Sequence, residues 1–286
     1  MPPANTERAN PDLEDIAVIV TGAARGMGRA MALGLANAGV RVAAADLRAS
    51  HSEMCEVLDI ARKQGVQNRI APIDCDVTQW PDCEQAVRAA VDRFGVVHGL
   101  VNNAGLGMQG FGNVIVGERK KFYEHDVDAW RRSMDVNFNG AFMMAKAIAP
   151  TLVAQRFGRI VNIETSHFTM VMDGFSPYGP SKAALEAATV IWAKDLAGTG
   201  VTVNALLPGG PGNTRMIPLA EIADRSTLVQ PEVMVAPICW MMSKASDGVS
   251  GRRFTANAWD LALPASEAAE KASAPAGWEV NASKPF

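Results

Sequence analysis

Residues 16–28 read IAVIVTGAARGMG, and this stretch decides the fold. A short apolar run is typical of a strand buried on both faces, and the glycines that follow it allow a tight turn into a helix. Such a turn lets the backbone approach a pyrophosphate, and the free N–H groups of the helix N-terminus favour its negative charge. Glycines also serve ordinary turns, so the turn alone is weak evidence for a dinucleotide site. Its candidate cofactor contacts are Gly22, Arg25, Gly26, Met27 and Gly28.

The sequence beyond this turn alternates short β-branched runs with longer segments of helical period, which is the pattern of βαβ units. We expect strands at 16–21, 40–46, 69–73, 97–102, 159–163, 201–206 and 253–256. Helices are expected at 28–38, 52–64, 81–94, 126–155, 180–198 and 231–243. The prediction is an α/β fold: a doubly wound parallel sheet with helices on both faces, a Rossmann fold.

One domain is expected, because no linker divides the 286 residues. The dinucleotide-binding catalytic domain is predicted to span 15–261, between a loose N-terminal arm at 1–14 and an irregular C-terminal tail at 262–286. Residues 106–125 form a long connection, and connections of this length in compact domains are often functional.

The charge is spread along the chain, with 27 basic and 30 acidic residues and a net charge of -3. No basic stripe suggests nucleic acid or membrane, so a small-molecule substrate is expected. The four cysteines show neither a regular framework nor ligand spacing, and no secretory signal or membrane span is visible. We therefore expect a cytoplasmic protein without a metal site.

Asp46 ends the second predicted strand, where a carboxylate can accept hydrogen bonds from the adenosine ribose. It would repel a 2′-phosphate, which favours NAD over NADP. Arg25 and Arg48 are the opposing observation, because either could bind a 2′-phosphate. NAD is the prediction, with NADP the alternative.

Tyr178 and Lys182 are four residues apart at the start of a predicted helix and so share one face. A phenol with an ordinary pKa of about 10 is a poor base at neutral pH, but a nearby ammonium favours the phenolate. The pair is a candidate acid/base, although any isolated Y-x-x-x-K can arise by coincidence.

The motifs together resemble the short-chain dehydrogenase/reductase family. In one order the chain carries the glycine turn, Asn102-Asn103-Ala104-Gly105, Val136-Asn137, the strand before Thr165, Tyr178/Lys182 and Pro208-Gly209. The likeness runs from about residue 16 to 259 and implies an NAD(P)-dependent oxidoreductase acting between a secondary alcohol and a ketone. Tyr178 would move the proton, Lys182 would lower its pKa and hold the nicotinamide ribose, and Asn137 would support a proton relay.

The same resemblance assigns further cofactor contacts. Asp76 and Val77 would lie near the adenine, Asn103, Ala104 and Gly105 would line the site, and Pro208, Gly209 and Thr214 would shape the nicotinamide end. The segment from Pro208 to Thr214 is one residue longer than the usual P-G-x-x-x-T, which leaves the role of Thr214 less defined.

The substrate-oxygen donor has two candidates. The family usually reads I-V-N-I-S-S, whereas this chain reads Ile160-Val161-Asn162-Ile163-Glu164-Thr165-Ser166. Counting along the strand, and the 13 residues to Tyr178, favour Thr165, whereas residue type favours Ser166. Adjacent side chains in an extended segment point to opposite faces, and only a local bulge would turn Ser166 inward, so Thr165 is the prediction and Ser166 the alternative.

Other residues near this motif have less defined roles. Met170, Met172 and Phe175 are expected to line or cover the substrate cleft. His167 is kept outside the catalytic set, and Glu164 is either a pocket carboxylate or a residue satisfied at the core edge.

Two other functions remain open at this point. One is an NADP-dependent carbonyl or 3-oxoacyl reductase, and the other is a catalytically silent nucleotide-binding sensor or scaffold, against which the complete set Tyr178, Lys182 and Asn137 argues. A homotetramer, a dimer of dimers, is expected because the segments 138–149 and 183–193 are apolar on more than one face.

Overall fold

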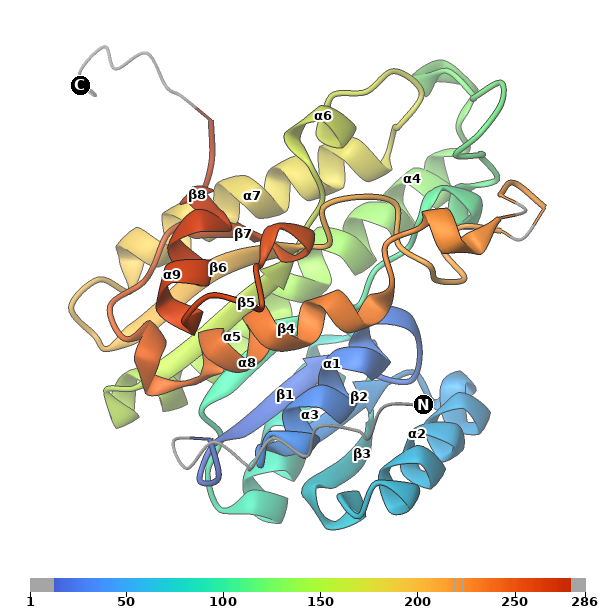
Figure 1. Ribbon diagram of the computed structural model, residues 1–286. Coiled ribbons are helices and arrows are strands. Elements are labelled where there is room, and N and C mark those ends of the chain that lie inside the picture. The colour runs from blue at the N-terminus through green and yellow to red at the C-terminus, as the bar shows by residue number, and fades with distance from the viewer. Residues whose placement is uncertain (1–12, 219, 223, 279–286) are drawn as a thin grey trace.

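A computed structural model describes residues 13–218, 220–222 and 224–278, and it confirms the α/β fold. One eight-stranded sheet runs through the molecule in the order β3-β2-β1-β4-β5-β6-β7-β8 (Figure 1). The seven predicted strands are parallel to one another. They are β1 (Ala17–Thr21), β2 (Arg41–Asp46), β3 (Ile70–Asp74), β4 (Gly99–Asn102), β5 (Gly158–Ile163), β6 (Val201–Leu207) and β7 (Arg252–Thr255).

Alternate side chains of each strand enter two separate cores. Val18 and Val20 of β1 face one core, and Ala17 and Ile19 face the other. The first core is covered by α1 (Gly26–Asn37), α2 (His51–Lys63) and α8 (Val235–Met242). The second is covered by α3 (Trp80–Phe94) and α5 (Gly140–Gln155), with the end of α7 (Tyr178–Asp195) packed against it. Both faces are buried, which explains why the strands read as continuous apolar runs.

The helix expected at 126–155 forms with an irregularity in its middle. It consists of α4 (Val127–Met134), a π-helical turn over Asp135–Asn139, and α5. Single π turns inserted in α-helices often mark functional positions. This one carries Asn137.

The end of the chain differs from the prediction of an irregular tail. Residues 265–271 form α9 (Ala265–Lys271), and β8 (Ser273–Pro275) pairs antiparallel with β7. The expectation fails because a three-residue edge strand needs no apolar pattern, while Ala, Glu and Lys favour a helix. The remainder of the tail, 279–286, lies outside the described residues.

The N-terminal arm can be compared with the structure only at its end, because residues 1–12 lie outside the described part. Leu13 is only 1% exposed and belongs to the first core. The prediction of a loose arm over 1–14 is therefore wrong at Leu13.

The long connection 106–125 forms a wall of short turns around Met108–Phe111 and Phe122–Glu124. Its buried Asn113 donates from Nδ2 to the Gly174 carbonyl oxygen at 2.9 Å. Glu221 accepts from the backbone N–H groups of Ile115 and Val116 at 2.7 and 2.9 Å. The connection is thus fixed to both loops that face it.

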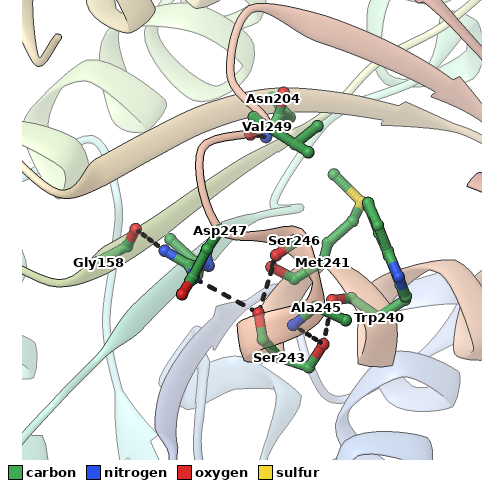
Figure 2. Close-up of polar contacts among 10 residues, drawn as sticks. Gly158, Asn204, Trp240, Met241, Ser243, Ala245, Ser246, Asp247 and Val249 are labelled. Carbon is green, nitrogen blue, oxygen red and sulfur yellow. Dashed lines mark hydrogen bonds and ion pairs between the residues drawn. The ribbon is translucent and has the colours of Figure 1, made fainter. Parts of the chain in front are cut away.

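At the N-terminal end of β5, Arg159 is a buried cation with only 2% exposure. Its guanidinium stacks 4.2 Å from the Phe157 ring centroid, donates to the carbonyls of Gly158 and Ser243, and pairs with Asp247. Gly158, Ser243 and Asp247 lie together in the close-up of the turn after α8 (Figure 2). The burial lowers the pKa of Arg159, and Asp247 opposes that shift. Arg159 therefore joins β5 to the turn after α8, far from the carboxyl ends of the strands.

Candidate active site

The glycine turn after β1 has the shape that a pyrophosphate requires. Gly22 and Gly26 have φ of +63° and +55°, a region that favours glycine. A Cβ on Gly28 would lie 2.0 Å from the Gly22 carbonyl oxygen, so no side chain fits there. No side chain caps the N-terminus of α1 at Arg25, which leaves its N–H groups available to an anion.

The segment after β4 holds this turn in place. Asn103 donates from Nδ2 to the carbonyl oxygens of Thr21 and Gly22 at 2.8 and 3.1 Å. Asn102 donates to Asn162 Oδ1 at 2.9 Å and so connects β4 to β5. These hydrogen bonds join the glycine turn, β4 and β5 at the centre of the sheet.

Asp46 lies against the glycine turn. Its Oδ2 accepts from the Ala24 N–H and its Oδ1 from the Leu47 N–H, both at 2.8 Å. A carboxylate offers about four acceptor positions, so two remain for ribose hydroxyls. The cations nearby already have partners: Arg25 and Arg215 lie 3.7 and 2.8 Å from Glu53, and Arg48 lies 3.5 Å from Asp74.

A single cleft of about 1350 Å³ follows the carboxyl ends of the strands and collects nearly all of the residues singled out by sequence. Among the predicted catalytic and cofactor residues Asn137 is the exception, because it is buried at 1% exposure and does not line the cleft. Thr214 lies over the glycine turn: a Cβ on Gly26 would be 3.1 Å from its Cγ2. The residues that line the cleft are Gly22, Arg25, Gly26, Met27, Gly28, Asp46, Asp76, Val77, Asn103, Ala104, Gly105, Thr165, Ser166, Tyr178, Lys182, Pro208, Gly209 and Thr214.

Asp76 borders the adenine end of this cleft, but its carboxylate is used locally. Oδ1 accepts from the N–H and the hydroxyl of Thr78 at 2.9 and 2.7 Å. The contact is a turn that shapes the loop before α3. Asp76 therefore shapes this edge of the cleft through the turn that its Oδ1 forms with Thr78.

Tyr178 and Lys182 lie one helical turn apart at the start of α7, as the four-residue spacing predicts, and both line the cleft. Burial raises the pKa of Tyr178 to about 12, and a hydrogen bond with the Thr165 side chain opposes this. Burial lowers the pKa of Lys182 to about 8, and the Glu164 carboxyl opposes that shift. Lys182 Nζ donates to the Ile163 carbonyl oxygen at 2.7 Å. The lysine is held at the end of β5, next to the two candidate hydroxyl donors.

The two candidate donors differ in what their hydroxyls already do. Ser166 is the N-cap of α6 (His167–Met170): its Oγ accepts from the Thr169 N–H at 3.1 Å and lies 2.8 Å from Thr169 Oγ1. The Thr165 side chain instead bonds Tyr178. Because adjacent residues in extended backbone point apart, only Thr165 is turned toward the tyrosine.

Asn137 anchors the wall of the cleft. Its Oδ1 accepts from the Leu106 N–H at 2.7 Å, and its Nδ2 donates to the Leu106 carbonyl oxygen and to Ser181 Oγ, both at 3.0 Å. The side chain thus joins the π turn, the connection after β4 and α7. Its partner Ser181 directly precedes Lys182 in the chain, and Asn137 itself does not line the cleft.

Sequence reasoning missed several residues that surround the site. Arg253 of β7 donates from Nη2 to the Thr165 carbonyl oxygen at 2.8 Å, and residues 271–275 form one side of the cleft. Glu186, one helical turn after Lys182, is fully buried and contacts Arg253 and His167. Met170 belongs to the core at 4% exposure and does not line the cleft, unlike Met172 and Phe175. Only Glu186 had a usable signal, its i, i+4 spacing from Lys182.

Two features of the described residues bear on the class of site. No group of three or more His, Cys, Asp or Glu among them could hold a metal ion. None of the helices in the described part has the length and apolar character that a bilayer span requires.

Comparison with known proteins agrees with this geometry. Residues 16–221 match the model of the short chain dehydrogenase family. A 3-oxoacyl-[acyl-carrier-protein] reductase of a Synechocystis species is 28% identical over 82% of this chain and 93% of its own. A 2-(R)-hydroxypropyl-CoM dehydrogenase of Xanthobacter autotrophicus is 34% identical over 67% of this chain and 72% of its own. A crystal structure of a dehydrogenase/reductase from Sinorhizobium meliloti superposes with a TM-score of 0.73 at 28% identity, covering 85% of this chain and 94% of that one.

The glycine turn, Asp46 and the capless helix N-terminus fit a nicotinamide dinucleotide, and the tyrosine and lysine lie farther along the same cleft. This chain is a member of the short-chain dehydrogenase family, an oxidoreductase that works with a nicotinamide cofactor.

Proposed function

We propose that the chain interconverts an apolar secondary alcohol and its ketone with NAD, using Tyr178 as the acid/base. The observation that carries the proposal is the convergence of three side chains in the cleft. Thr165 bonds Tyr178, and Lys182 is held by the Ile163 carbonyl beside them. This arrangement offers a proton carrier, a hydroxyl that fixes the substrate oxygen, and a cation next to both.

Tyr178, Lys182 and Thr165 have different roles in the reaction. Bound nicotinamide supplies or accepts the hydride. With a pKa raised to about 12 by burial, Tyr178 is protonated at neutral pH and ready to donate to a ketone oxygen. For oxidation it must lose that proton, and the Lys182 ammonium favours the phenolate. Thr165 donates to the substrate oxygen and holds it within reach of the tyrosine.

The cleft walls favour an apolar substrate. Beyond the tyrosine the lining is mainly thioether, aromatic and aliphatic: Met108, Ile115, Phe168, Met172, Phe175, Met216 and Ile217. Such side chains give little hydrogen-bonding to a polyhydroxylated sugar but bury hydrocarbon well.

NAD is proposed over NADP because of the partners around Asp46. A 2′-phosphate at this carboxylate would be repelled, and Arg25, Arg48 and Arg215 are each already paired with Glu53 or Asp74. Binding a phosphate would require one of these pairs to break.

The test is a panel of secondary alcohols, aliphatic, aromatic and sugar, followed by NADH formation, with NADP in parallel. We expect turnover of apolar alcohols with NAD and none above background in Tyr178→Phe, whose NAD-induced rise in Tm should match that of the wild type. Asp46→Ser should reduce the preference for NAD in kcat/KM. Substantial turnover by Tyr178→Phe would contradict the acid/base role of Tyr178. Use of NADP by the wild type with a kcat/KM as high as with NAD would contradict the proposed cofactor.

A second candidate, a 3-oxoacyl reductase using NADP, is favoured by the names of two relatives, the Synechocystis enzyme and one of Thermotoga maritima that is 29% identical. It is distinguished by NADPH oxidation with a 3-oxoacyl thioester, which the NAD proposal expects to be slow.

A further inference from the structure

Two buried carboxyl groups lie side by side behind the active site. Glu164 follows β5 and is 3% exposed, and Glu186 of α7 is 0% exposed. The two groups act on each other: burial and Glu186 raise the pKa of Glu164, and Glu164 lowers the pKa of Glu186. The Oε2 atom of each is buried and has no hydrogen-bond partner. An ionised carboxylate can only accept, so two such groups can satisfy each other only if one of them carries a proton.

The surroundings of the two groups are unequal. Glu186 Oε1 accepts from the Gly277 N–H at 2.6 Å, and it lies 3.3 Å from His167 Nε2 and 3.8 Å from Arg253 Nε. Glu164 Oε1 meets only the Thr189 hydroxyl, at 2.8 Å. A backbone donor and a guanidinium favour the ionised form at Glu186, whereas burial favours the neutral form at Glu164.

The other charged or titratable groups that face the pair belong to three segments in the described part. On α7 these are Lys182 and Tyr178, on α6 it is His167, and on β7 it is Arg253, while the segment after β8 contributes only the Gly277 N–H. Charge on Glu164 acts on Tyr178 and Lys182, and charge on Glu186 acts on Arg253 and His167. The location of the single negative charge therefore decides whether it acts on Tyr178 and Lys182 or on Arg253 and His167.

We propose that Glu164 and Glu186 share one proton and act as a positioning pair that keeps the negative charge on Glu186, beside Arg253 and away from the catalytic tyrosine. Arg253 is then held between Glu186 and the Thr165 carbonyl, which fixes the backbone of the proposed substrate-oxygen donor. Neutral Glu164 lets Tyr178 form its phenolate without a facing carboxylate. The role in catalysis rests on the proposed function, whereas the shared proton does not.

The pair supplies its own matched variants, because glutamine preserves the shape of either member. In Glu164→Gln the charge stays on Glu186, so the alkaline rise of kcat/KM for alcohol oxidation should keep the wild-type midpoint. In Glu186→Gln the charge moves to Glu164, which raises the pKa of Tyr178 and should shift the midpoint upward by about 0.5–1 pH unit. A role limited to packing would leave both midpoints alone. Arg253→Met, which removes the cation that favours charge on Glu186, should shift the midpoint in the same direction and serves if Glu186→Gln does not fold.

Infrared difference spectra at pH 7 test whether Glu164 and Glu186 share a proton, and they require no catalytic turnover. The wild type should show the carbonyl stretch of a protonated carboxylic acid, sensitive to D2O, and both glutamine variants should lack it. Absence of this band in the wild type, its survival in Glu186→Gln, or superimposable pH profiles of the two variants would overturn the proposal. Lack of turnover with every alcohol, with the band present, would refute the proposed function and leave the proton-sharing pair standing.

Discussion

At the scale of single residues, the chain separates two adjacent hydroxyl groups by giving one of them a structural task. Ser166 caps α6, so its hydroxyl is engaged with Thr169. Thr165 carries an extra methyl group, which restricts χ1 and keeps its hydroxyl directed at Tyr178. Residue type alone favours the serine, and the cap explains why it is not available.

Thr165→Val should therefore cost two or more decades in kcat, about 3 kcal/mol of transition-state stabilisation, because one oriented donor is lost. Ser166→Ala should leave kcat near the wild-type value and lower the free energy of unfolding by about 1 kcal/mol through the lost cap. Steady-state kinetics and urea titration of both variants measure this. The opposite ranking, with both proteins folded and binding NAD, would assign the donor role to Ser166.

The burial of Lys182 in the site lowers the free energy of unfolding. Burial lowers its pKa from 10.5 in the unfolded chain to about 8 in the folded one. Between these values the unfolded chain binds more protons, so this group makes the free energy of unfolding rise with pH from about 8 to 10.5. Below pH 8 the full penalty of burying an ammonium remains.

Lys182→Met removes that penalty, so it should abolish activity while raising Tm at pH 7. The difference in Tm between the variant and the wild type should shrink as the pH is raised toward 10.5. Calorimetry across this range measures it. A difference that stays constant with pH would show that the lysine is not destabilised by burial.

At the scale of elements, the turn after α8 is the partner that keeps Arg159 buried at the start of β5. Asp247→Asn leaves the guanidinium without its counter-ion and should lower the free energy of unfolding by about 1–3 kcal/mol, a value reduced because Asp247 is itself exposed. Since β5 carries Thr165 at its other end, kcat per folded molecule should not change. Chemical denaturation and kinetics on the same samples separate the two effects, and Asp260→Asn is a surface control. A drop in kcat with unchanged stability would contradict this assignment.

The elements themselves were largely predictable because most are long or strongly apolar. Strands such as β1 and β6 are covered on both faces, so their sequences are continuous apolar runs that predict a buried strand. In contrast, β8 is three residues of Ser, Ala and Pro at the sheet edge, and its pairing with β7 comes from proximity alone. The glycine turn and the Tyr178–Lys182 pair are local patterns and were found. Glu186 and Arg253 were not, because their contact joins α7 to β7 across 66 intervening residues, and no local pattern links the two positions.

At the scale of the whole molecule, two helices present apolar side chains to the outside. Phe142 of α5 and Ile191 of α7 are 45% and 54% exposed, although they lie in otherwise well-packed helices. Exposed aromatic and aliphatic side chains on neighbouring helices are typical of an interface between copies.

We expect a homotetramer at micromolar concentration, measured by light scattering. The double variant Phe142→Glu/Ile191→Glu should have a lower mass, whereas Leu261→Glu, at an exposed apolar position outside both helices, is the matched control. A monomeric mass of the wild type would refute the expectation. An unchanged mass of the double variant would show that the interface lies on another surface of the protein.

The position of α9 and β8 beside the cleft has a consequence for substrate selectivity. The family match stops at residue 221, yet Arg253, the wall at 271–275 and the Gly277 N–H that meets Glu186 all come later. The glycine turn, Asp46, Tyr178 and Lys182 thus lie within the family match, while one side of the cleft is formed by residues that follow it. Exchanging residues 262–278 with the equivalent stretch of a relative should therefore alter which alcohols are accepted before it alters which coenzyme is bound.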